Sequence, residues 1–134
     1  MVRFSRKEDY GVLLISRLAH NYNKRLMPLS EVAKEHKISL LFLRNVALEL
    51  RLAGLISAVE GKHGGYKLNK DPQTIYFGEI IQAFSKDPIF SCCQKTKDGK
   101  CRGSCPHGFS LRRLNNIFLE KMAGLKMDEL MSYK

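Results

Sequence analysis

The sequence predicts a mainly α-helical protein with a small β-hairpin wing: a winged helix-turn-helix followed by a long C-terminal dimerisation helix. Three observations predict this fold. Two short helical segments are separated by a tight turn, a glycine-rich hairpin pattern follows them, and an apolar stripe runs along the last helical segment. The 134 residues are enough for one domain, or for a small domain with an appendage. We expect the winged helix-turn-helix over 1–72, and a cysteine loop with the dimerisation helix over 73–134.

The first predicted helix covers about 5–21. Apolar residues keep helical spacing through this segment, Ser5 is a suitable N-cap, and acidic residues follow it early in the helix. Residues 21–24 have the composition of a turn, and Pro28 prevents the helix from simply continuing.

The helix-turn-helix is predicted from the next two segments. A short helix over about 30–36 begins at Ser30, and a two-residue turn follows it. Ser39 is the N-cap of a helix over about 40–53, which ends where Gly54 takes the C′ position. The inward-facing stripe of this helix consists of Leu43, Val46, Ala47 and Leu50.

The wing is predicted directly after this helix pair. Residues 55–59 have strand character, 60–65 form a glycine-rich turn, and 66–68 alternate like a returning strand. A β-hairpin in this place is the layout of a winged helix-turn-helix. Its tip carries the cations Lys62 and His63.

The second half of the chain contains two further helical patterns around an aperiodic segment. A short amphipathic helix is expected at about 75–85, and residues 86–106 are expected to form a loop that is longer than usual. Helical spacing returns over about 107–124, where the stripe needs a partner, either the N-terminal module or a second copy of the chain. This stripe consists of Leu111, Leu114, Ile117, Phe118, Met122 and Leu125.

The charge indicates a polyanionic partner. Twenty-three Lys and Arg against 13 Asp and Glu give a net charge of +10, which favours nucleic acid first and an acidic membrane face second. Residues 1–70 carry 13 basic and 6 acidic side chains, so most of the surplus lies with the helix-turn-helix. The chain begins with no signal-peptide pattern, and its apolar runs are too short to span a bilayer. We therefore expect a cytoplasmic protein that does not enter a membrane.

Double-stranded DNA is the expected partner, read by the 40–53 helix and the wing. Arg44 suits guanine, Asn45 suits adenine, and Leu41 or Phe42 suits a thymine methyl group. The full set of candidate DNA-binding residues is Ser39, Leu41, Phe42, Arg44, Asn45, Lys62, His63 and Tyr66.

Phosphate contacts are expected from Lys37 and Arg51. A second interpretation stays open, in which Arg44 and Asn45 are ordinary solvated residues. Some apolar side chains of this helix then pack on the protomer or on a partner; these are Leu41, Phe42, Leu48 and Leu52.

Four cysteines indicate a metal or cluster site, because dense thiolates in a reducing compartment repel one another unless a cation neutralises them. Zinc and an iron–sulfur cluster, [2Fe–2S] or [4Fe–4S], both suit such ligands. Adjacent cysteines cannot easily bind one metal together, so three thiolates are expected, from Cys93 (or Cys92), Cys101 and Cys105. The fourth ligand is His107 or a carboxylate from elsewhere. The alternative is a set of free or oxidised thiols without metal.

The whole chain resembles the IscR/NsrR-type family of bacterial iron–sulfur winged-helix regulators over nearly all of residues 1–130. The segments that carry the resemblance are 4–10 (FSRKEDY), 29–33 (LSEVA), Ile38-Ser39 with Leu43, 54–56 (GLI), the wing 61–66 (GKHGGY), and the three-cysteine loop before a long helix.

The resemblance implies a homodimer built on the 107–124 helix and a cluster held by three cysteines. In such regulators the fourth ligand varies: His107 matches one version, and Asp9 (less well Glu8) of the partner subunit matches another. The cysteine spacing is uneven compared with the biogenesis regulator. Glu60 replaces an arginine that some members carry before the wing, and Arg44 replaces an acidic base-reading residue. These differences leave the DNA target open.

The expected function is a DNA-binding transcription regulator, a repressor, controlled by an iron–sulfur cluster that senses redox state, nitric oxide or iron–sulfur status. Two alternatives are a cluster-free thiol-switch regulator and a zinc-binding interaction module. An enzyme is not expected, because no nucleophile–base pair stands out and 61–65 lacks the Lys-Ser/Thr ending of a phosphate-binding loop.

Overall fold

Helix α1 (Arg6–His20) begins at the N-cap that the sequence predicts. The computed structural model describes residues 5–84 and 106–132, with only the backbone of 106–109. The Ser5 hydroxyl accepts from the Glu8 backbone N–H at 3.3 Å, and the Glu8 carboxylate accepts from the Ser5 N–H at 2.5 Å. This capping box satisfies two N–H groups that a helix start leaves without partners.

Helices α2 (Leu29–His36) and α3 (Leu40–Leu52) form the predicted helix pair. The prediction placed the start of α2 one residue late, because Pro28 rather than Ser30 sets it: Pro28 is the N-cap, with an extended ψ of 136°. Its ring fixes φ, and no side chain of the described residues caps this end of the helix.

The wing consists of β1 (Ile56–Val59) and β2 (Gly65–Leu68), paired antiparallel with Ile56 opposite Leu68. The other edge of β2 is covered as well, since Met27 and Tyr66 exchange two backbone hydrogen bonds of 3.0 and 2.9 Å. The segment before α2 therefore acts as a short third strand beside β2.

The second half adds η1 (Pro72–Thr74), α4 (Phe77–Phe84), α5 (Pro106–Ala123) and α6 (Met127–Met131). The predicted 75–85 and 107–124 helices are confirmed to within two residues, whereas the sequence pattern does not predict α6. Its backbone is tied to the start of α4: the N–H of Phe77 donates to Leu125 at 2.8 Å, and that of Met127 donates to Ile75 at 2.9 Å. The chain after α5 thus returns to the N-terminal module.

One core joins both halves of the described chain. α1, α3 and α4 pack against one another, and β2 contacts α1. Ile75, Ile80 and Met127 belong to the same buried cluster as Leu14 and Leu50. The inward stripe predicted for α3 is confirmed, since all four of its residues are buried. The domain boundary at residue 72 stays a prediction.

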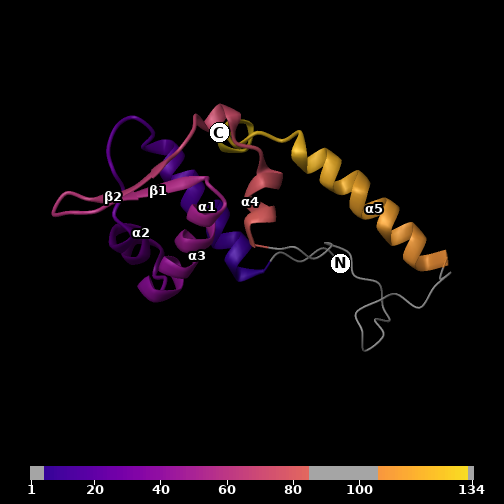
Figure 1. Ribbon diagram of the computed structural model, residues 1–134, viewed down its shortest axis with the longest axis horizontal. Helices are drawn as coiled ribbons and strands as arrows, with labels where there is room; N and C mark the ends of the chain where they lie inside the picture. Colours follow the sequence, from indigo (N-terminus) through magenta and orange to yellow (C-terminus); the bar gives the residue numbers. More distant parts are fainter. Residues whose placement is uncertain (1–4, 85–105, 133–134) are drawn as a thin grey trace.

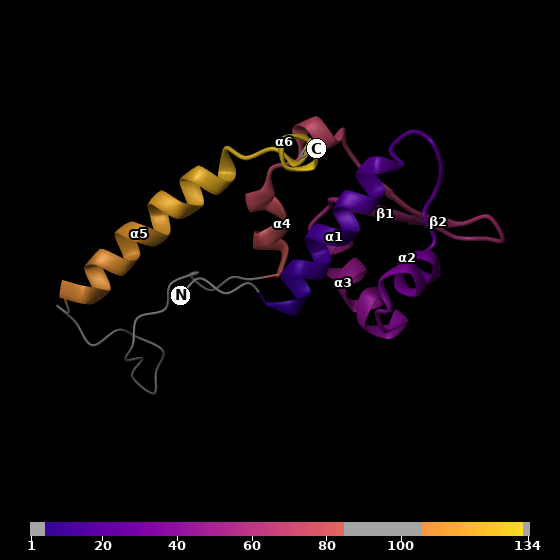
Figure 2. The ribbon, with the colours of Figure 1, turned by 180° about the vertical axis from the view of Figure 1, so that it is seen from behind.

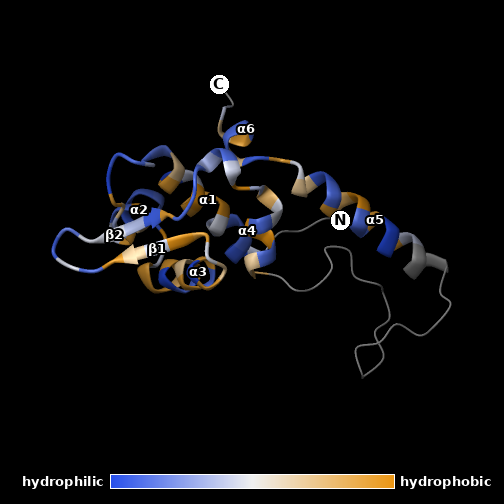
Figure 3. Cartoon of the chain, turned by 45° about the horizontal axis from the view of Figure 1, so that its top comes forward, coloured by the Kyte–Doolittle hydropathy of each residue, from blue (hydrophilic) through white to orange (hydrophobic). Residues whose placement is uncertain are grey.

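The hairpin and α5 project from opposite ends of this core, as Figures 1 and 2 show from the two sides. Hydrophobic and hydrophilic residues are interspersed along α5 (Figure 3). Leu114 and Ile117 on this helix are exposed, whereas Met122 is buried. Most of the predicted loop, including all four cysteines, lies outside the described residues.

Glu79 ties α4 to the end of the wing. Its carboxylate accepts from the Lys70 Nζ at 2.6 Å and from the Tyr76 backbone N–H at 2.9 Å. Burial raises the pKa of Glu79, but the two hydrogen bonds and the charge of Lys70 lower it by more. The net effect is a pKa below the ordinary value of 4.5.

We expect Glu79→Gln to lower the free energy of unfolding at pH 7 but not at pH 2.5. A carboxyl with a lowered pKa stabilises the fold above its unfolded pKa, about 4.3, and this stabilisation is lost as the pH falls through the folded pKa. The side chain is 37% exposed, so screening by solvent keeps the effect below about 1 kcal/mol. Urea unfolding at both pH values measures it, and an equal difference at both contradicts the assignment.

We expect Gly65→Ala to destabilise the protein by about 1–3 kcal/mol, as overpacking does. A Cβ at Gly65 lies 2.9 Å from the carbonyl carbon of Met27 and 3.0 Å from its N and O, so the strand-like pair must separate. Lys67→Ala on the same strand is the control, because Lys67 is exposed, and a change within about 0.5 kcal/mol is expected. Equal urea midpoints for the two variants contradict the role given to Met27.

Candidate nucleic-acid interface

The turn between α2 and α3 has the geometry of a helix-turn-helix. Lys37 ends α2 in the left-handed region, at φ 53° and ψ 43°, and the Ile38 N–H donates to the Ala33 carbonyl at 2.9 Å. The Ser39 hydroxyl then accepts from the Phe42 N–H at 3.4 Å and caps α3. This turn is predicted from the sequence, and the structure confirms it.

Helix α3 has a buried face and an exposed face. Leu43, Val46, Ala47 and Leu50 are buried against the core. On the outward face, the predicted base-reading residues Arg44 and Asn45 are exposed, together with Leu41 at 69%. The structure therefore brings these three predicted residues onto one free surface, near the N-terminal end that a recognition helix places against base edges.

Phe42 lies apart from that outward surface. Its ring packs edge-on against Tyr10 of α1, with centroids 5.5 Å apart and an interplanar angle of 78°. The Arg6 guanidinium lies 5.9 Å from the centroid of the same ring. Phe42 is thus a half-buried contact between α3 and the first turns of α1, and its predicted DNA contact stays a prediction.

The predicted DNA contacts of the wing also differ in exposure. Lys62 and His63 are exposed at the tip, where Gly61 takes a φ of 121° that other residues rarely adopt. Tyr66 lies in β2 opposite Ala58 and is half-buried against the core. The tip therefore offers two exposed nitrogen-bearing side chains, and the Tyr66 ring helps to anchor the wing.

Several acidic side chains near the interface are engaged by neighbouring cations. The ion pairs are Lys7–Glu49, Arg17–Glu35 and Arg25–Glu31. The hydrogen bonds from Arg25 lower the pKa of Glu31. Within residues 5–84 and 106–132, by contrast, Arg44, Arg51 and Lys62 form no ion pair. These three cations on the faces that the sequence assigns to DNA are therefore not neutralised by a carboxylate of the described residues.

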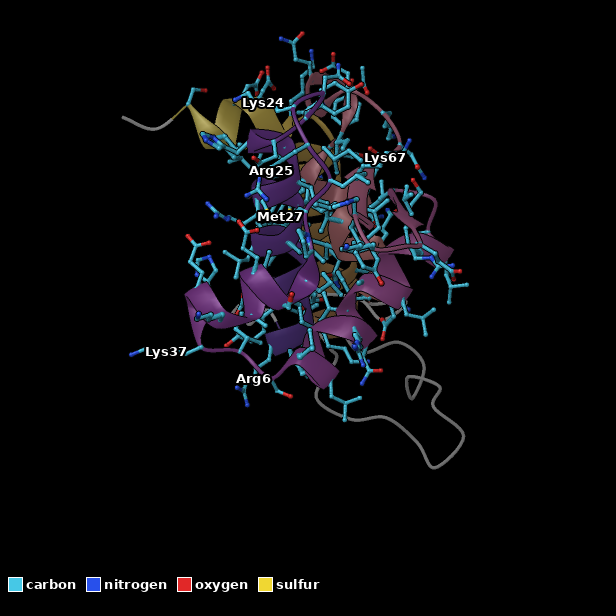
Figure 4. The ribbon with its side chains drawn as sticks, turned by 90° about the vertical axis from the view of Figure 1, so that its left-hand side faces the viewer. Arg6, Lys24, Arg25, Met27, Lys37 and Lys67 are labelled. Carbon is cyan, nitrogen blue, oxygen red and sulfur yellow. The ribbon has the colours of Figure 1, made fainter. Side chains whose placement is uncertain are left out.

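Lys37 extends from the turn into solvent, and Arg6 lies near the same end of the molecule in Figure 4. Both residues are exposed. Cations at this end surround the start of α3, which is the place where phosphates flank a recognition helix.

The two acidic candidates for a cluster ligand differ in environment. Glu8 is buried and its carboxylate is used in the capping box. Asp9 is exposed, its side chain has no hydrogen bond or ion pair in the described part of the chain, and it borders a cavity of about 180 Å³ between α1 and α4. Glu8, Val12, Phe77 and Ile81 complete the lining. Of the two carboxylates, that of Asp9 is therefore the more available as a ligand.

The remaining predicted ligands are not placed by the structure. Cys92, Cys93, Cys101 and Cys105 lie outside the described residues, and only the backbone of His107, in the first turn of α5, is described. Among described side chains, no group of three His, Cys, Asp or Glu is arranged to hold a metal ion. No helix within the same residues is long and apolar enough to cross a membrane.

Sequence reasoning missed two contacts that shape this interface. The packing of Arg6 and Tyr10 on Phe42 joins α1 to α3, and the pairing of Met27 with Tyr66 holds the wing. The spacing of Arg6 and Tyr10, four residues apart on one helical face, is a signal for the first contact. No local sequence pattern predicts the pairing of Met27 with Tyr66, because the two residues are 39 positions apart.

Three comparisons relate this fold to known proteins. Residues 4–133 match the Rrf2 family, described as an iron-dependent transcriptional regulator. The HTH-type transcriptional regulator IscR of Vibrio vulnificus is 30% identical over 133 residues, covering 98% of this chain and 78% of the relative.

Solved structures of CymR share the fold. CymR of B. subtilis, described as the global cysteine regulator, aligns over 100% of this chain and 99% of its own, with a TM-score of 0.82 and 24% identity. The oxidized form of Staphylococcus aureus CymR aligns over 98% of both chains, with a TM-score of 0.76 and 26% identity.

We expect Arg44→Ala and Arg51→Ala to weaken DNA binding in different ways. Arg44 lies on the exposed face near the start of α3 and is expected to contact a base, so its loss is expected to cost about 1–3 kcal/mol in each half-site and to relax sequence preference. Arg51 is expected to contact phosphate, so its loss weakens binding to specific and random duplexes alike and lowers the salt dependence. Fluorescence anisotropy at several salt concentrations separates the two. If Arg44→Ala weakens both duplexes equally, Arg44 does not read bases.

Proposed function

The chain belongs to the Rrf2 family of transcriptional regulators, and on that basis we propose that it is a homodimeric repressor whose binding to operator DNA is controlled by an iron–sulfur cluster. It is a DNA-binding regulator rather than an enzyme, as its relatives are. The observation that carries the proposal is the capped helix α3, which presents Arg44 and Asn45 on an exposed face beside a cationic wing. Family membership also favours this function over a zinc-binding interaction module.

The donor set of the chain fits an iron–sulfur cluster. Cys93 (or Cys92), Cys101 and Cys105 would supply three thiolates, the ligands that such clusters prefer. His107 or the partner's Asp9 would complete the set, and the exposure of Asp9 supports that carboxylate over Glu8. When bound, the cluster supplies a group whose charge and ligation change when it is oxidised, nitrosylated or lost.

The contacts between α1 and α3 support a route from the ligand to DNA. Asp9 is followed by Tyr10, whose ring packs on Phe42 in the first turn of α3. Lys7, in the same turn of α1, pairs with Glu49 of α3. A displacement of the first turn of α1 therefore reaches α3 through two direct contacts. We take this pair of helices as the element that the state of the cluster biases.

The exposed apolar side chains of α5 support a homodimer. Leu114 and Ile117 are three residues apart and 44% and 47% exposed, on a helix that projects from the core (Figure 1). A second copy of α5 would cover such a face on both subunits at once. We propose repression, in which a dimer bound over a promoter would block access of RNA polymerase.

The test is operator binding by holo and apo protein. Anaerobic purification with iron and sulfide counts establishes the holo form, and selection from random duplexes supplies the operator. We expect the two forms to differ at least tenfold in affinity for the operator at matched salt, because the cluster biases the position of α3. Equal affinities would overturn control by the cluster.

Two variants sharpen this test. Cys101→Ser removes a thiolate and is expected to bind DNA as the apo form does, whether or not iron is supplied. Phe42→Leu keeps an apolar side chain but loses the aromatic contact with Tyr10, so the holo-to-apo ratio is expected to shrink. A full ratio in Phe42→Leu contradicts the route through this contact while leaving control by the cluster in place.

A second candidate function is a cluster-free thiol switch. The likeness to CymR from Staphylococcus aureus, solved in an oxidized form, favours it. Anaerobically purified protein without iron, whose DNA affinity changes on treatment with a disulfide-forming oxidant, supports this candidate over the first.

A further inference from the structure

The outward face of α3 carries a line of exposed leucines. Leu41, Leu48 and Leu52 are 69%, 49% and 79% exposed. At about 100° per residue, the three lie within about 40° of one another around the helix, on the side opposite the buried Leu50. The centre of the DNA-facing surface is therefore apolar, where a polar face is usual for a solvated helix.

Arginines flank this line on one side, and residues that contact α1 flank it on the other. By the same helical spacing, Arg44 and Arg51 lie along one side, and both are exposed without an ion pair in the described part of the chain. Phe42 and Glu49 lie along the other side, where they contact Tyr10 and Lys7 of α1. The leucines are thus free, and the cations beside them complement a polyanion.

The major groove of duplex DNA fits both the apolar line and the cations beside it. Its edges carry phosphates for the arginines, and the C5-methyl group of thymine is the apolar group on its floor. An acidic protein with an apolar patch would also complement such a face, but the family of this chain consists of DNA-binding transcriptional regulators, which favours duplex DNA.

We propose that Leu41 reads a thymine by contacting its C5-methyl group in each operator half-site. This deepens the proposed function and rests on it. Leu41 is in the first turn of α3, the end that a recognition helix places against bases. Leu52 lies about 16 Å further along the helix axis, away from that end. Phe42, the other residue suited to a methyl group, is held against Tyr10.

The experiment removes the methyl group and nothing else. The full-length protein selects a duplex from a random pool, and uracil then replaces single thymines of the half-site. Affinities are measured by fluorescence anisotropy at fixed salt for the wild type, Leu41→Ser and Leu52→Ser. Both serine variants change an exposed side chain, so neither is expected to disturb the core, and circular dichroism checks this.

For the wild type, we expect uracil at one position in the half-site to weaken binding about fourfold, and about fifteenfold when both half-sites are changed. Leu41→Ser is expected to bind the thymine duplex more weakly and to show no loss with uracil. Leu52→Ser is expected to keep the full dependence on the methyl group. This pattern assigns the methyl contact to Leu41.

Three results overturn the inference. One is equal binding of thymine and uracil duplexes by the wild type while the selected duplex is still preferred over random DNA, which leaves the proposed function standing. Another is full methyl dependence in Leu41→Ser. A third is a fall in molar mass of the free protein in Leu41→Ser, which assigns the leucines to a second copy of the chain. If no duplex is selected over random DNA, the proposed function itself fails.

Discussion

The packing of α1 against α3 is the constraint on which the DNA-facing surface depends. The Phe42 ring contacts Tyr10 and Arg6, and Lys7 pairs with Glu49, so one side of α3 is fixed to the start of α1. The core stripe of α3 fixes a second side. The remaining face of α3 is exposed. Its position relative to the wing follows from these contacts and from the pairing of Met27 with Tyr66 of β2.

This arrangement makes the start of α1 a structural support of the proposed DNA interface. Aromatic and charged contacts of this kind are modest in energy, about 0.5–1.5 kcal/mol for an aromatic pair. A contact of modest energy suits the proposed regulation, because a ligand bound by the neighbouring Asp9 would have to compete with it. Glu8 is the poorer candidate ligand, because its carboxylate already accepts a hydrogen bond in the capping box.

Much of the fold is predictable from local sequence. The N-caps Ser5 and Ser39 and the outward position of Arg44 follow from spacing and short-range chemistry, and the structure agrees. The rest depends on distant partners. α6 is too short to have a periodic signal, and it forms against Ile75, far back in the chain. The half-buried placement of Phe42 depends on Tyr10 of another helix. The cysteine ligands stay predictions, since their geometry lies outside the described residues.

We propose that the free face of α3 occupies the major groove of an operator. Protection of the selected duplex from dimethyl sulfate tests this most directly, since the reagent methylates guanine N7 in the major groove and adenine N3 in the minor groove. We expect protected guanine N7 atoms in each half-site, with that protection lost in Arg44→Ala. Fully reactive guanine N7 atoms on an occupied operator would contradict it.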